Sequence, residues 1–526
     1  MNRSEIKREV ERRWPGQAEC RFVPADSVCE VLCALPVLPE VCGRLFLEWD
    51  HSFAGLIVEE GSGAWQLRYV FFGDPGAGWI HVLVDAPLEE KTFPSIVKFV
   101  HAADWHEREA EDLFGLKFAG HPRLGDFVLH DDAWQEGVEP MRHGFDAQAA
   151  LKQRMPAEDW RPRRIVQEPG AFVMPVGPKY SGVTESVHFL LETVGEDVIR
   201  STPRLFYKWR AVEKLAEGKS AEDVLLLAER FAATTAFAHG LAFCHAVEAA
   251  CGVNIPARAR VLRVFLAELE RLRQHTGAIQ EICESTALVV ANSQAGILEE
   301  DLLRISGELT GHRYLFGLLA LGGLQCDLSS EACTTALRRA RETLEHLNEL
   351  EQRLRVSSSF LDRLEEVGAV AHRDAMVYGL LGPVARASGV VRDLRRAQPY
   401  SGYEQYQFDI PGEQEGDGYA RLRVLFAEAR QSVRVMEQAL AALPSGGVRD
   451  PFPLRAGAAL GWVEAPRGGA FHWVRLAEGG TVARYHIMTP SFANWHGFHL
   501  AVEKFAFQDF PIMLSTFDLS VAESDR

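Results

Sequence analysis

Three long stretches of the sequence repeat apolar residues at the spacing of an α-helix. Residues 221–251, 257–274 and 337–355 place apolar side chains at positions i, i+3, i+4 and i+7. This spacing gives each helix one apolar stripe, which must be buried against other elements. The second half of the chain is therefore predicted to be mainly a helical bundle, with a shorter β-rich part near residues 458–487.

The first 145 residues follow a different pattern, in which short apolar runs end in turn residues. The runs predicted to be strands are residues 44–49, 67–72 and 79–86, each rich in aromatic or β-branched side chains. A helix is expected near residues 96–100, leading into the acidic run at residues 105–109. We therefore predict an α+β chain whose residues 1–145 form a small α/β domain.

Residues 146–170 separate the two patterns and are polar and rich in proline, so they are predicted to be a linker. Residues 171–526 then form the second domain, a helical bundle with peripheral β-hairpins. One hairpin is expected at its start, where the apolar run of residues 186–194 precedes the turn Gly195-Glu196-Asp197.

Composition excludes several classes of function. The net charge of −17 leaves no basic surface for nucleic acid. No apolar run reaches the roughly 18 residues of a membrane span, and the first residues lack the apolar core of a signal peptide. No P-loop or GxGxxG motif supports a nucleotide site. The nine cysteines are too few for a disulfide scaffold and are expected to be mainly buried free thiols.

The acidic run carries the first specific motif. Glu107 and Glu111 share one helix face, and Gly115 is expected to end the helix, so the residues alone favour a solvated acidic face. The composite pattern E-R-E-x-x-D-L-F-G, followed by F-x-G-H-P at residues 118–122, resembles the C subunit of respiratory complex I. That resemblance implies a structural domain without a redox centre.

A second motif surrounds Glu185 and His188. A histidine beside apolar residues is more often part of a core than a ligand, yet an acid and an imidazole on a projecting hairpin suit proton exchange. With residues 204–217, this stretch resembles the D subunit of complex I. It is more similar to the large subunits of membrane-bound nickel–iron hydrogenases of the hydrogenase-4 and formate-hydrogenlyase type, which have a Glu and a His at these places. Their most ancestral members fuse a C-like to a D-like domain.

Charged residues of the long helices and two later motifs continue the resemblance. The helical positions are Glu248, Arg258, Arg263, Glu270, Arg271 and His275, some of which charge pairing along a helix would explain. Residues 382–400 match the family pattern GPxxRASGxxxDxR…PY, and residues 464–468 match EAPRG. Arg386, in a glycine-flanked turn, is a candidate for stabilising an anion or tuning a redox centre. With Asp393 and the two hairpin residues it forms the candidate set for proton transfer.

Four thiolates are missing where the resemblance requires them. In these hydrogenases a cysteine pair near each end of the domain holds the nickel–iron centre. At the matching positions this chain has Ala232, Thr235, Ser520 and Glu523. Neither serine nor threonine ionises near pH 7, and one carboxylate does not replace four soft sulfur ligands. The sequence therefore predicts that the chain holds no nickel–iron centre and no other metal.

The same helix start bears on quinone binding. In complex I the D subunit has a tyrosine near Ala233 and a loop histidine near Thr184, and this chain has neither. The small residues Ala232, Ala233 and Thr235, with His239 one turn further on, are predicted to line the vacated pocket. Whether a quinone enters that pocket stays open.

The resemblance implies the large subunit of a complex attached peripherally to the cytoplasmic face of the inner membrane. Implied partners are an iron–sulfur small subunit like the B subunit of complex I, a ferredoxin-like subunit and membrane ion-translocating subunits. The iron–sulfur cluster would lie in the small subunit, leaving quinone as the one candidate cofactor of this chain. Arg386, Asp393 and residues 464–468 are expected near the small subunit, where unpaired charges would be costly.

Two alternatives remain: a purely structural subunit and a quinone-reducing subunit. If electrons are transferred, the acceptor is expected between the hairpin of Glu185 and His188 and the helix start at residues 232–235. The hydrogenases of this type lose a C-terminal extension once nickel is loaded. This chain ends at Asp525-Arg526, where the mature form would end, which agrees with a protein that never receives nickel.

Overall fold

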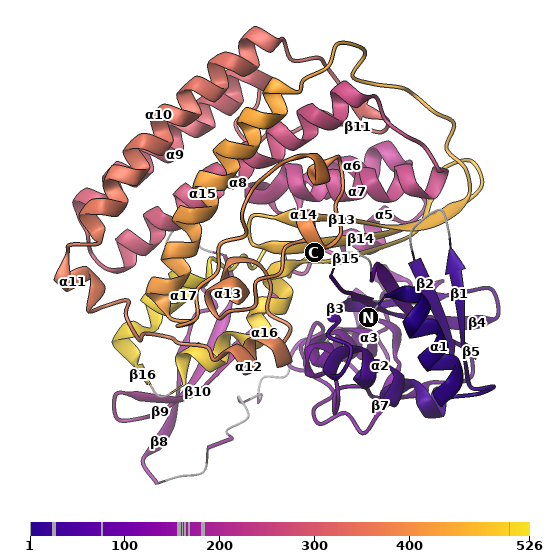
Figure 1. The fold of residues 1–526 in the computed structure, drawn as a ribbon. Coiled ribbons are helices and arrows are strands. Elements are labelled where there is room, and N and C mark those ends of the chain that lie inside the picture. The colour runs from indigo at the N-terminus through magenta and orange to yellow at the C-terminus, as the bar shows by residue number, and fades with distance from the viewer. Residues whose placement is uncertain are drawn as a thin grey trace.

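The computed structural model describes residues 2–23, 28–74, 77–154, 159, 161, 165–166, 169–179, 185–503 and 505–526. Thr184, with Pro156 and Pro162 of the predicted linker, lies outside the described residues. The chain is mixed α and β, as predicted, with a smaller N-terminal domain packed against a larger helical one (Figure 1).

The N-terminal domain is built on a five-stranded sheet with the order β1-β2-β5-β4-β3. Its strands are β1 (Ala18–Val23), β2 (Val28–Cys33), β3 (Ser52–Glu60), β4 (Ala64–Phe72) and β5 (Trp79–Pro87). Neighbouring strands run antiparallel except β2 and β5, which are parallel. The helices packed on this sheet are α1 (Arg3–Arg13), α2 (Leu38–Leu47) and α3 (Asp104–Phe114).

Two of the three predicted strands are confirmed as β4 and β5, and the third is wrong. Most of residues 44–49 belongs to α2, where Leu45 and Phe46 are buried against the sheet. The helix expected at residues 96–100 is a turn, and the helix begins instead at Asp104. The aromatic side chains of residues 44–49 favoured a strand, but the helical spacing of their apolar residues is what matches the observed structure.

Helix α3 ends as expected, but its acidic face is not solvated. Gly115 closes the helix in the left-handed region, at φ 69°. Glu107 is fully buried and accepts hydrogen bonds from Ser95 Oγ (2.6 Å) and Ile96 N (2.9 Å). Burial raises the pKa of Glu107 to about 8. The prediction of a solvated face is therefore wrong at Glu107.

The second domain is dominated by long helices, as their periodicity predicts. These are α6 (Ala221–Arg230), α7 (Ala236–Cys251), α8 (Ala257–Ser285), α9 (Val289–Thr310), α10 (Ser330–Leu354) and α15 (Gly418–Ala441). Helix α8 is central and contacts α7, α9 and α15. Figure 1 shows α9 and α10 on the side of this bundle that faces away from the N-terminal domain.

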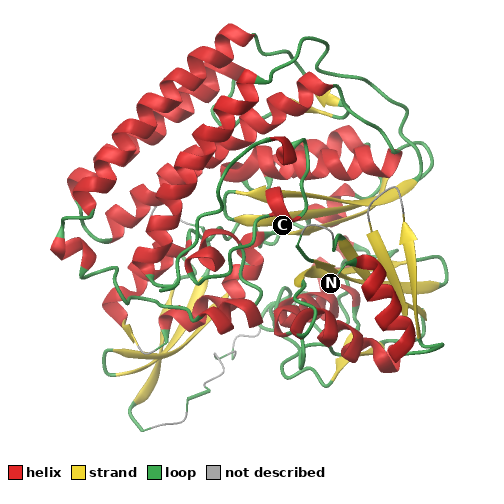
Figure 2. Cartoon of the chain, in the orientation of Figure 1, coloured by secondary structure: helices red, strands yellow, loops and turns green. Residues whose placement is uncertain are grey.

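A three-stranded antiparallel sheet joins the bundle to the N-terminal domain. It consists of β13 (Gly457–Ala465), β14 (Gly468–Leu476) and β15 (Val482–Met488), which confirms the predicted β-rich part. Helix α7 packs against β13 and β14, while β14 and β15 also contact β3 of the N-terminal domain. Figure 2 shows these strands between the long helices and the N-terminal domain.

A second small sheet lies at the lower left of the molecule in Figure 1. Its order is β16-β10-β9-β8, from β8 (Ala171–Val176), β9 (His188–Val194), β10 (Asp197–Arg204) and β16 (Phe505–Ala506). The predicted hairpin at the Gly195 turn is confirmed as β9 and β10. The segment predicted as a linker contains one helix, α4 (Ala147–Gln153), and so is not wholly irregular.

Short elements complete the chain. They are β6 (Thr92–Pro94), β7 (Lys117–Ala119), α5 (Val212–Ala216), β11 (Leu319–Ala320), β12 (Gly323–Leu324), α11 (Ser358–Leu361), α12 (His372–Val377), α13 (Gly382–Ala387) and α14 (Leu394–Ala397). Within the described part, no helix has the length and apolarity needed to cross a membrane.

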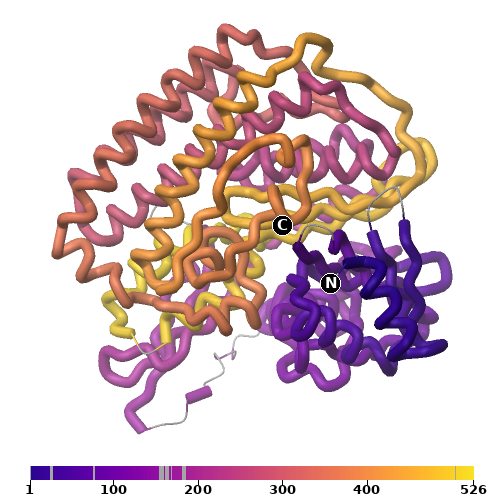
Figure 3. The backbone as a smooth tube through the Cα atoms, viewed as in Figure 1, coloured from indigo at the N-terminus to yellow at the C-terminus, as the bar shows by residue number. Residues whose placement is uncertain are grey.

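The last residues run into the interior of the molecule. Helices α16 (Pro490–Val502) and α17 (Phe510–Phe517) precede a tail of nine residues, 518–526. The final residues, Asp525 and Arg526, are 2% and 1% exposed. Figure 3 shows the end of the chain where the two domains meet. The tail is therefore a packed element that joins both domains.

Candidate functional site

The segment between α6 and α7 is one side of the candidate site. Ala232 is followed by a single turn of 3-10 helix at Ala233–Thr235, and α7 begins at the next residue. Ala232 and Thr235 are buried, at 1% and 0% exposure, whereas Ala233 between them is exposed. The turn therefore reaches the surface at one residue and the interior at its neighbours.

The C-terminal tail is the other side. Thr235 Oγ1 donates a hydrogen bond of 2.9 Å to Glu523 Oε1. Ser520 Oγ accepts from the backbone N–H of Glu523, at 3.3 Å, and so closes a turn within the tail. Two segments separated by 288 positions in the chain thus meet in the interior. The structure brings together Thr235, Ser520 and Glu523, as the matching of positions predicts.

Arg467 and Asp518 complete this cluster, and neither was among the predicted site residues. The guanidinium of Arg467 lies 3.0 Å from Asp518 Oδ1 and 3.4 Å from Glu523 Oε1. The Arg467 side chain also donates to Thr234 Oγ1 at 3.0 Å. One cation is therefore shared by two carboxylates, one of which, Glu523, stands at a matched position.

The electrostatics of Glu523 follow from these contacts. Burial alone would raise its pKa, but the neighbouring His239 and the charge of Arg467 outweigh burial and lower the pKa to about 2. His239 Nε2 lies 3.6 Å from Glu523 Oε1. Glu523 is thus ionised at neutral pH and bound on three sides.

His239 starts a chain of hydrogen bonds that leads away from the tail. Its Nδ1 lies 3.1 Å from His472 Nε2, and His472 Nδ1 lies 2.7 Å from the hydroxyl of Tyr485. Burial, and secondarily His239, holds the pKa of His472 well below its ordinary value, so His472 is neutral at pH 7. The chain is geometrically able to pass a proton between neighbours, and it equally fixes β14 and β15 against α7.

The first turn of α7 is capped by a carboxylate from another helix. The backbone N–H groups of Phe237 and Ala238 donate to the two oxygens of Glu270, at 2.8 and 2.9 Å. Burial raises the pKa of Glu270 to about 7. A carboxylate at a helix N-terminus satisfies donors that no residue of the helix itself can reach. Glu270, predicted as part of the charged pattern, therefore positions the helix start.

The two hairpin residues have separate partners. Glu185 precedes β9 and accepts hydrogen bonds from the tail amides of Val521 (2.5 Å) and Ala522 (3.1 Å). His188 lies at the start of β9, is 9% exposed, and has its Nδ1 3.2 Å from the hydroxyl of Tyr207. Neither residue is at the Gly195 turn, and the tail lies between Glu185 and the start of α7.

Arg386 and Asp393 belong to a different buried cluster. Arg386 Nε lies 2.7 Å from Glu428 Oε1, and its Nη1 lies 2.8 Å from Glu464 Oε1 and 3.8 Å from Asp393 Oδ2. The remaining members are Glu268, Arg271, His275 and Arg395. Arg386 and Asp393 are 0% and 1% exposed. Both charges are therefore paired within this chain, and the expectation that they lie near the small subunit stays a prediction.

The two clusters touch through a glycine. Gly382 begins α13, the helix of Arg386, at φ +65°. A Cβ atom at this position would lie 2.0 Å from the carbonyl oxygen of Arg467. Only glycine permits this conformation and this approach together. The glycine of the GPxxR pattern therefore sets the spacing between the Arg386 cluster and the Arg467 cluster.

Comparison with known families decides what kind of protein this is. The family described as respiratory-chain NADH dehydrogenase, 49 Kd subunit, matches residues 297–455 and 450–526. The corresponding 30 Kd subunit family matches residues 50–150. Formate hydrogenlyase subunit 5 of Escherichia coli is 30% identical over 93% of this chain and 87% of its own length. The chain belongs to the family of complex I and group 4 hydrogenase large subunits.

Further members of this family match almost the whole chain. Hydrogenase-4 component G of Escherichia coli is 30% identical, over 100% of this chain and 93% of its own length. The C/D subunit of NADH-quinone oxidoreductase from Methylococcus capsulatus is 25% identical, over 98% of this chain and 97% of its own length. The predicted order, a part like the C subunit of complex I before a part like its D subunit, is the order of the two matches.

A nickel–iron centre, which group 4 hydrogenases of this family hold through cysteines, does not fit the residues present. Ala232 offers no donor atom, and the hydroxyls of Thr235 and Ser520 are already engaged with Glu523. Glu523 is bound to Arg467, a cation that would repel a metal ion. In the described part of the chain, no three histidine, cysteine or carboxylate side chains are placed to hold a metal together.

Sequence reasoning overlooked the residues that fill this space. Arg467 belongs to the EAPRG pattern, and Asp518 is the first residue of the tail. Neither segment indicates from sequence alone which carboxylate pairs with which arginine. In the other cluster, Glu428 on α15, which pairs with Arg386, also carries no motif. The available signal was Arg467 itself, because an arginine in a matched pattern could pair with the carboxylate that replaces a cysteine.

Proposed function

We propose that this chain is the large peripheral subunit of a membrane-associated oxidoreductase complex, and that it works without a nickel–iron centre. Membership of the family supports a subunit of such a complex. The observation that carries the rest of the proposal is the Arg467 cluster. Glu523 and Thr235, at two of the four positions where the resemblance places thiolates, are hydrogen-bonded to each other, and Glu523 is ion-paired with Arg467.

The partner of this protein is an iron–sulfur small subunit that docks where Ala233 reaches the surface. Ala233 is exposed, and Thr234 beside it is half-buried and accepts a hydrogen bond from Arg467, which is paired with Asp518. An electron arriving at this face would reach the chain next to Ala232, which stands at one of the four positions where the resemblance places a cysteine. The complex as a whole would lie on the cytoplasmic face of the membrane, held there by membrane subunits.

The first test is the metal content of the complex. The full chain is purified with its natural partners from cells grown with nickel, and nickel and iron are measured per chain. We expect nickel below about one tenth of an equivalent, because the donor set offers no thiolate. Nickel approaching one per chain, or hydrogen uptake by the complex, would contradict the proposal.

A second experiment separates electron transfer from scaffolding. Ala233→Trp places a large side chain on the proposed docking face, and Ala441→Trp, at the exposed end of α15, is the matched control. Loss of the iron–sulfur protein from the purified Ala233→Trp complex alone would support docking at this face. Assembly with electron transfer reduced at least tenfold would support an acceptor beside it.

A purely structural role is the second candidate, and one observation favours it. The two buried clusters satisfy most of their charges internally, as expected for a scaffold. The tail also lies between Glu185 and the start of α7, where an electron acceptor was expected. Unchanged assembly and unchanged turnover in Ala233→Trp would leave the structural role as the conclusion.

A further inference from the structure

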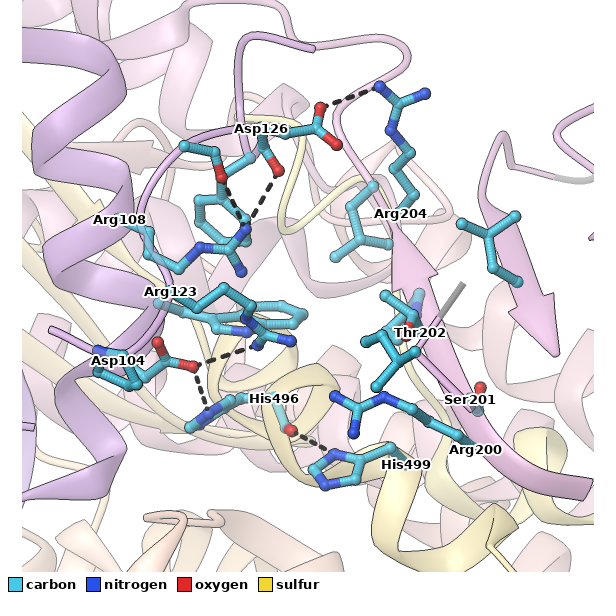
Figure 4. A pocket seen from close by; sticks show the side chains of 18 of the residues that line it. Asp104, Arg108, Arg123, Asp126, Arg200, Ser201, Thr202, Arg204, His496 and His499 are labelled. Atoms are coloured by element: carbon cyan, nitrogen blue, oxygen red, sulfur yellow. Dashed lines mark hydrogen bonds and ion pairs between the residues drawn. The ribbon is translucent and has the colours of Figure 1, made fainter. Parts of the chain in front are cut away.

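A cavity of about 730 Å³ lies between the N-terminal domain and the β9–β10 hairpin, away from the Arg467 cluster. Helix α3 supplies Asp104 and Arg108 to one wall, and β10 supplies Arg200 and Thr202 to the other (Figure 4). Its apolar lining includes Trp105, Leu190 and Leu205. A volume of this size holds a small organic molecule.

Most charges around the cavity already have partners. Asp104 lies 3.2 Å from His496 Nε2, 3.1 Å from His121 Nε2 and 3.4 Å from Arg123 Nη2. Arg204 lies 2.9 Å from Asp126 and is bound by further aspartates. These groups therefore offer little charge to a ligand.

Two arginines are different. Arg108 donates only to the backbone carbonyls of Gly125 and Asp126, both at 3.1 Å, although it is 8% exposed. The Nε atoms of Arg108 and Arg200 are buried without a hydrogen-bond partner, and within the described residues no carboxylate oxygen lies within 4.0 Å of either guanidinium. Figure 4 shows Arg200 pointing into the cavity toward His496 and His499.

The cavity lining also contains imidazoles, and these add no positive charge of their own. Burial lowers the pKa of His101 and of His499 to about 4, so both are neutral at pH 7. His499 Nε2 lies 3.3 Å from the hydroxyl of Tyr378, and the rings of His101 and His496 are 5.0 Å apart. These neutral side chains supply hydrogen-bonding groups, and the arginines supply positive charge.

We propose that this interdomain cavity binds a small organic anion. Its phosphate or carboxylate group is held by Arg200, while Arg108 on the facing wall adds positive charge, and its apolar body lies against Trp105, Leu190 and Leu205. Guanidinium groups match both kinds of oxyanion, and a buried arginine without a carboxylate partner is costly until an anion compensates it. Because the two arginines belong to different domains, the ligand joins them.

The test uses the full-length protein and three probes of one shape: phenyl phosphate, phenylacetate and the neutral benzyl alcohol. Binding is measured by calorimetric titration at fixed ionic strength, and melting temperature is measured with and without each probe. We expect saturable binding of at least one anionic probe with a rise in melting temperature. Comparison of the two anions decides between phosphate and carboxylate.

Two variants and one control locate the binding. Arg200→Gln removes the charge on β10, and Thr202→Glu places a carboxylate in the cavity; each should weaken anion binding at least tenfold. The control Arg338→Gln changes an exposed arginine on α10 and should bind like the wild type. Equal binding in Arg200→Gln, equal binding of benzyl alcohol, or no saturable binding of either anion would overturn the proposal.

Discussion

At the scale of single residues, Arg467 decides what the space between the tail and α7 contains. Its guanidinium is 8% exposed and lies within 3.4 Å of two carboxylates. Charges in such a place stabilise only as a complete set, because removing one leaves another buried and unpaired. The cluster is therefore sensitive to single substitutions and tolerant of paired ones.

This reasoning predicts the effect of breaking the pair. Glu523→Gln retains an acceptor for Thr235 but leaves Arg467 with one carboxylate, and Arg467→Gln leaves both acids unpaired. We expect each to lower the free energy of unfolding by about 3 kcal/mol, and the double variant to cost less than the sum. Urea denaturation measures this, and Arg304→Gln, in an exposed helical pair, should cost under about 0.5 kcal/mol.

Glu107 gives a second prediction at this scale. Its pKa is raised from 4.5 to about 8 by burial, so the folded state holds a proton that the unfolded state has released. Its contribution is therefore fully present below pH 4.5 and is lost as pH rises to about 8. The melting temperature of Glu107→Gln should fall less than that of the wild type between pH 5 and 8. Parallel pH profiles of the two proteins would contradict this assignment.

The sequence could identify Glu107 but not its surroundings. Helical spacing correctly placed it on one face with Glu111, and Gly115 was correctly predicted as the cap. What packs against that face, the turn at Ser95 and Ile96, comes from another element. The same limit applies to Arg386, whose partners Glu428 and Glu464 lie on α15 and β13.

At the scale of elements, the three long stretches predicted to be helical are helical, but their ends were predicted less well, and α9 and α15 were not predicted individually. The apolar period of residues 221–251 continues through the break at residues 231–235, where the chain turns and α7 starts under Glu270. Apolar periodicity indicates which residues are buried. Because residues on both sides of the break are buried, the period does not reveal where one helix ends and the next begins. Residues 44–49 fail for the opposite reason, since aromatic side chains suit a strand or the buried face of a helix equally.

The tail is the element whose role was least visible in the sequence, and it carries the third prediction. Asp525 accepts from the amides of Phe206 (2.8 Å) and Lys208 (3.2 Å), and Arg526 lies 2.8 Å from Glu109. Deleting these two residues should lower the melting temperature by several degrees, because the buried amide of Phe206, the partly buried amide of Lys208 and the buried acid Glu109 lose partners. Limited proteolysis should then cut near residues 206–210.

A matched comparison makes this deletion informative. Asp525→Asn preserves the shape of the side chain and one acceptor oxygen, so its loss of stability should be smaller than that of the deletion. If the deletion melts like the wild type, the tail does not hold the two domains together. Cleavage elsewhere in the chain would argue against a local opening at the β10 end.

At the scale of the whole molecule, the two domains share one apolar core. Phe492 on α16 has its ring 5.5 Å from Trp105 and 5.0 Å from His106, both on α3. An ion pair of 2.7 Å joins Arg475 to Glu59 across the same interface. The existence and order of the two domains were predictable from motifs; their docking was not, since it depends on side chains more than 380 positions apart.

This shared core leads to the last prediction, that the two domains unfold together. Phe492→Ala removes a ring that packs against aromatic side chains of both domains, and should cost about 3–5 kcal/mol. Calorimetry should show one transition, moved to lower temperature in the variant. Amides in α3 and in α8 should lose protection from hydrogen exchange by similar amounts, because both exchange through the same global opening. Two separate transitions, or loss of protection confined to α3, would mean that the N-terminal domain is an independent unit resting on the helical one.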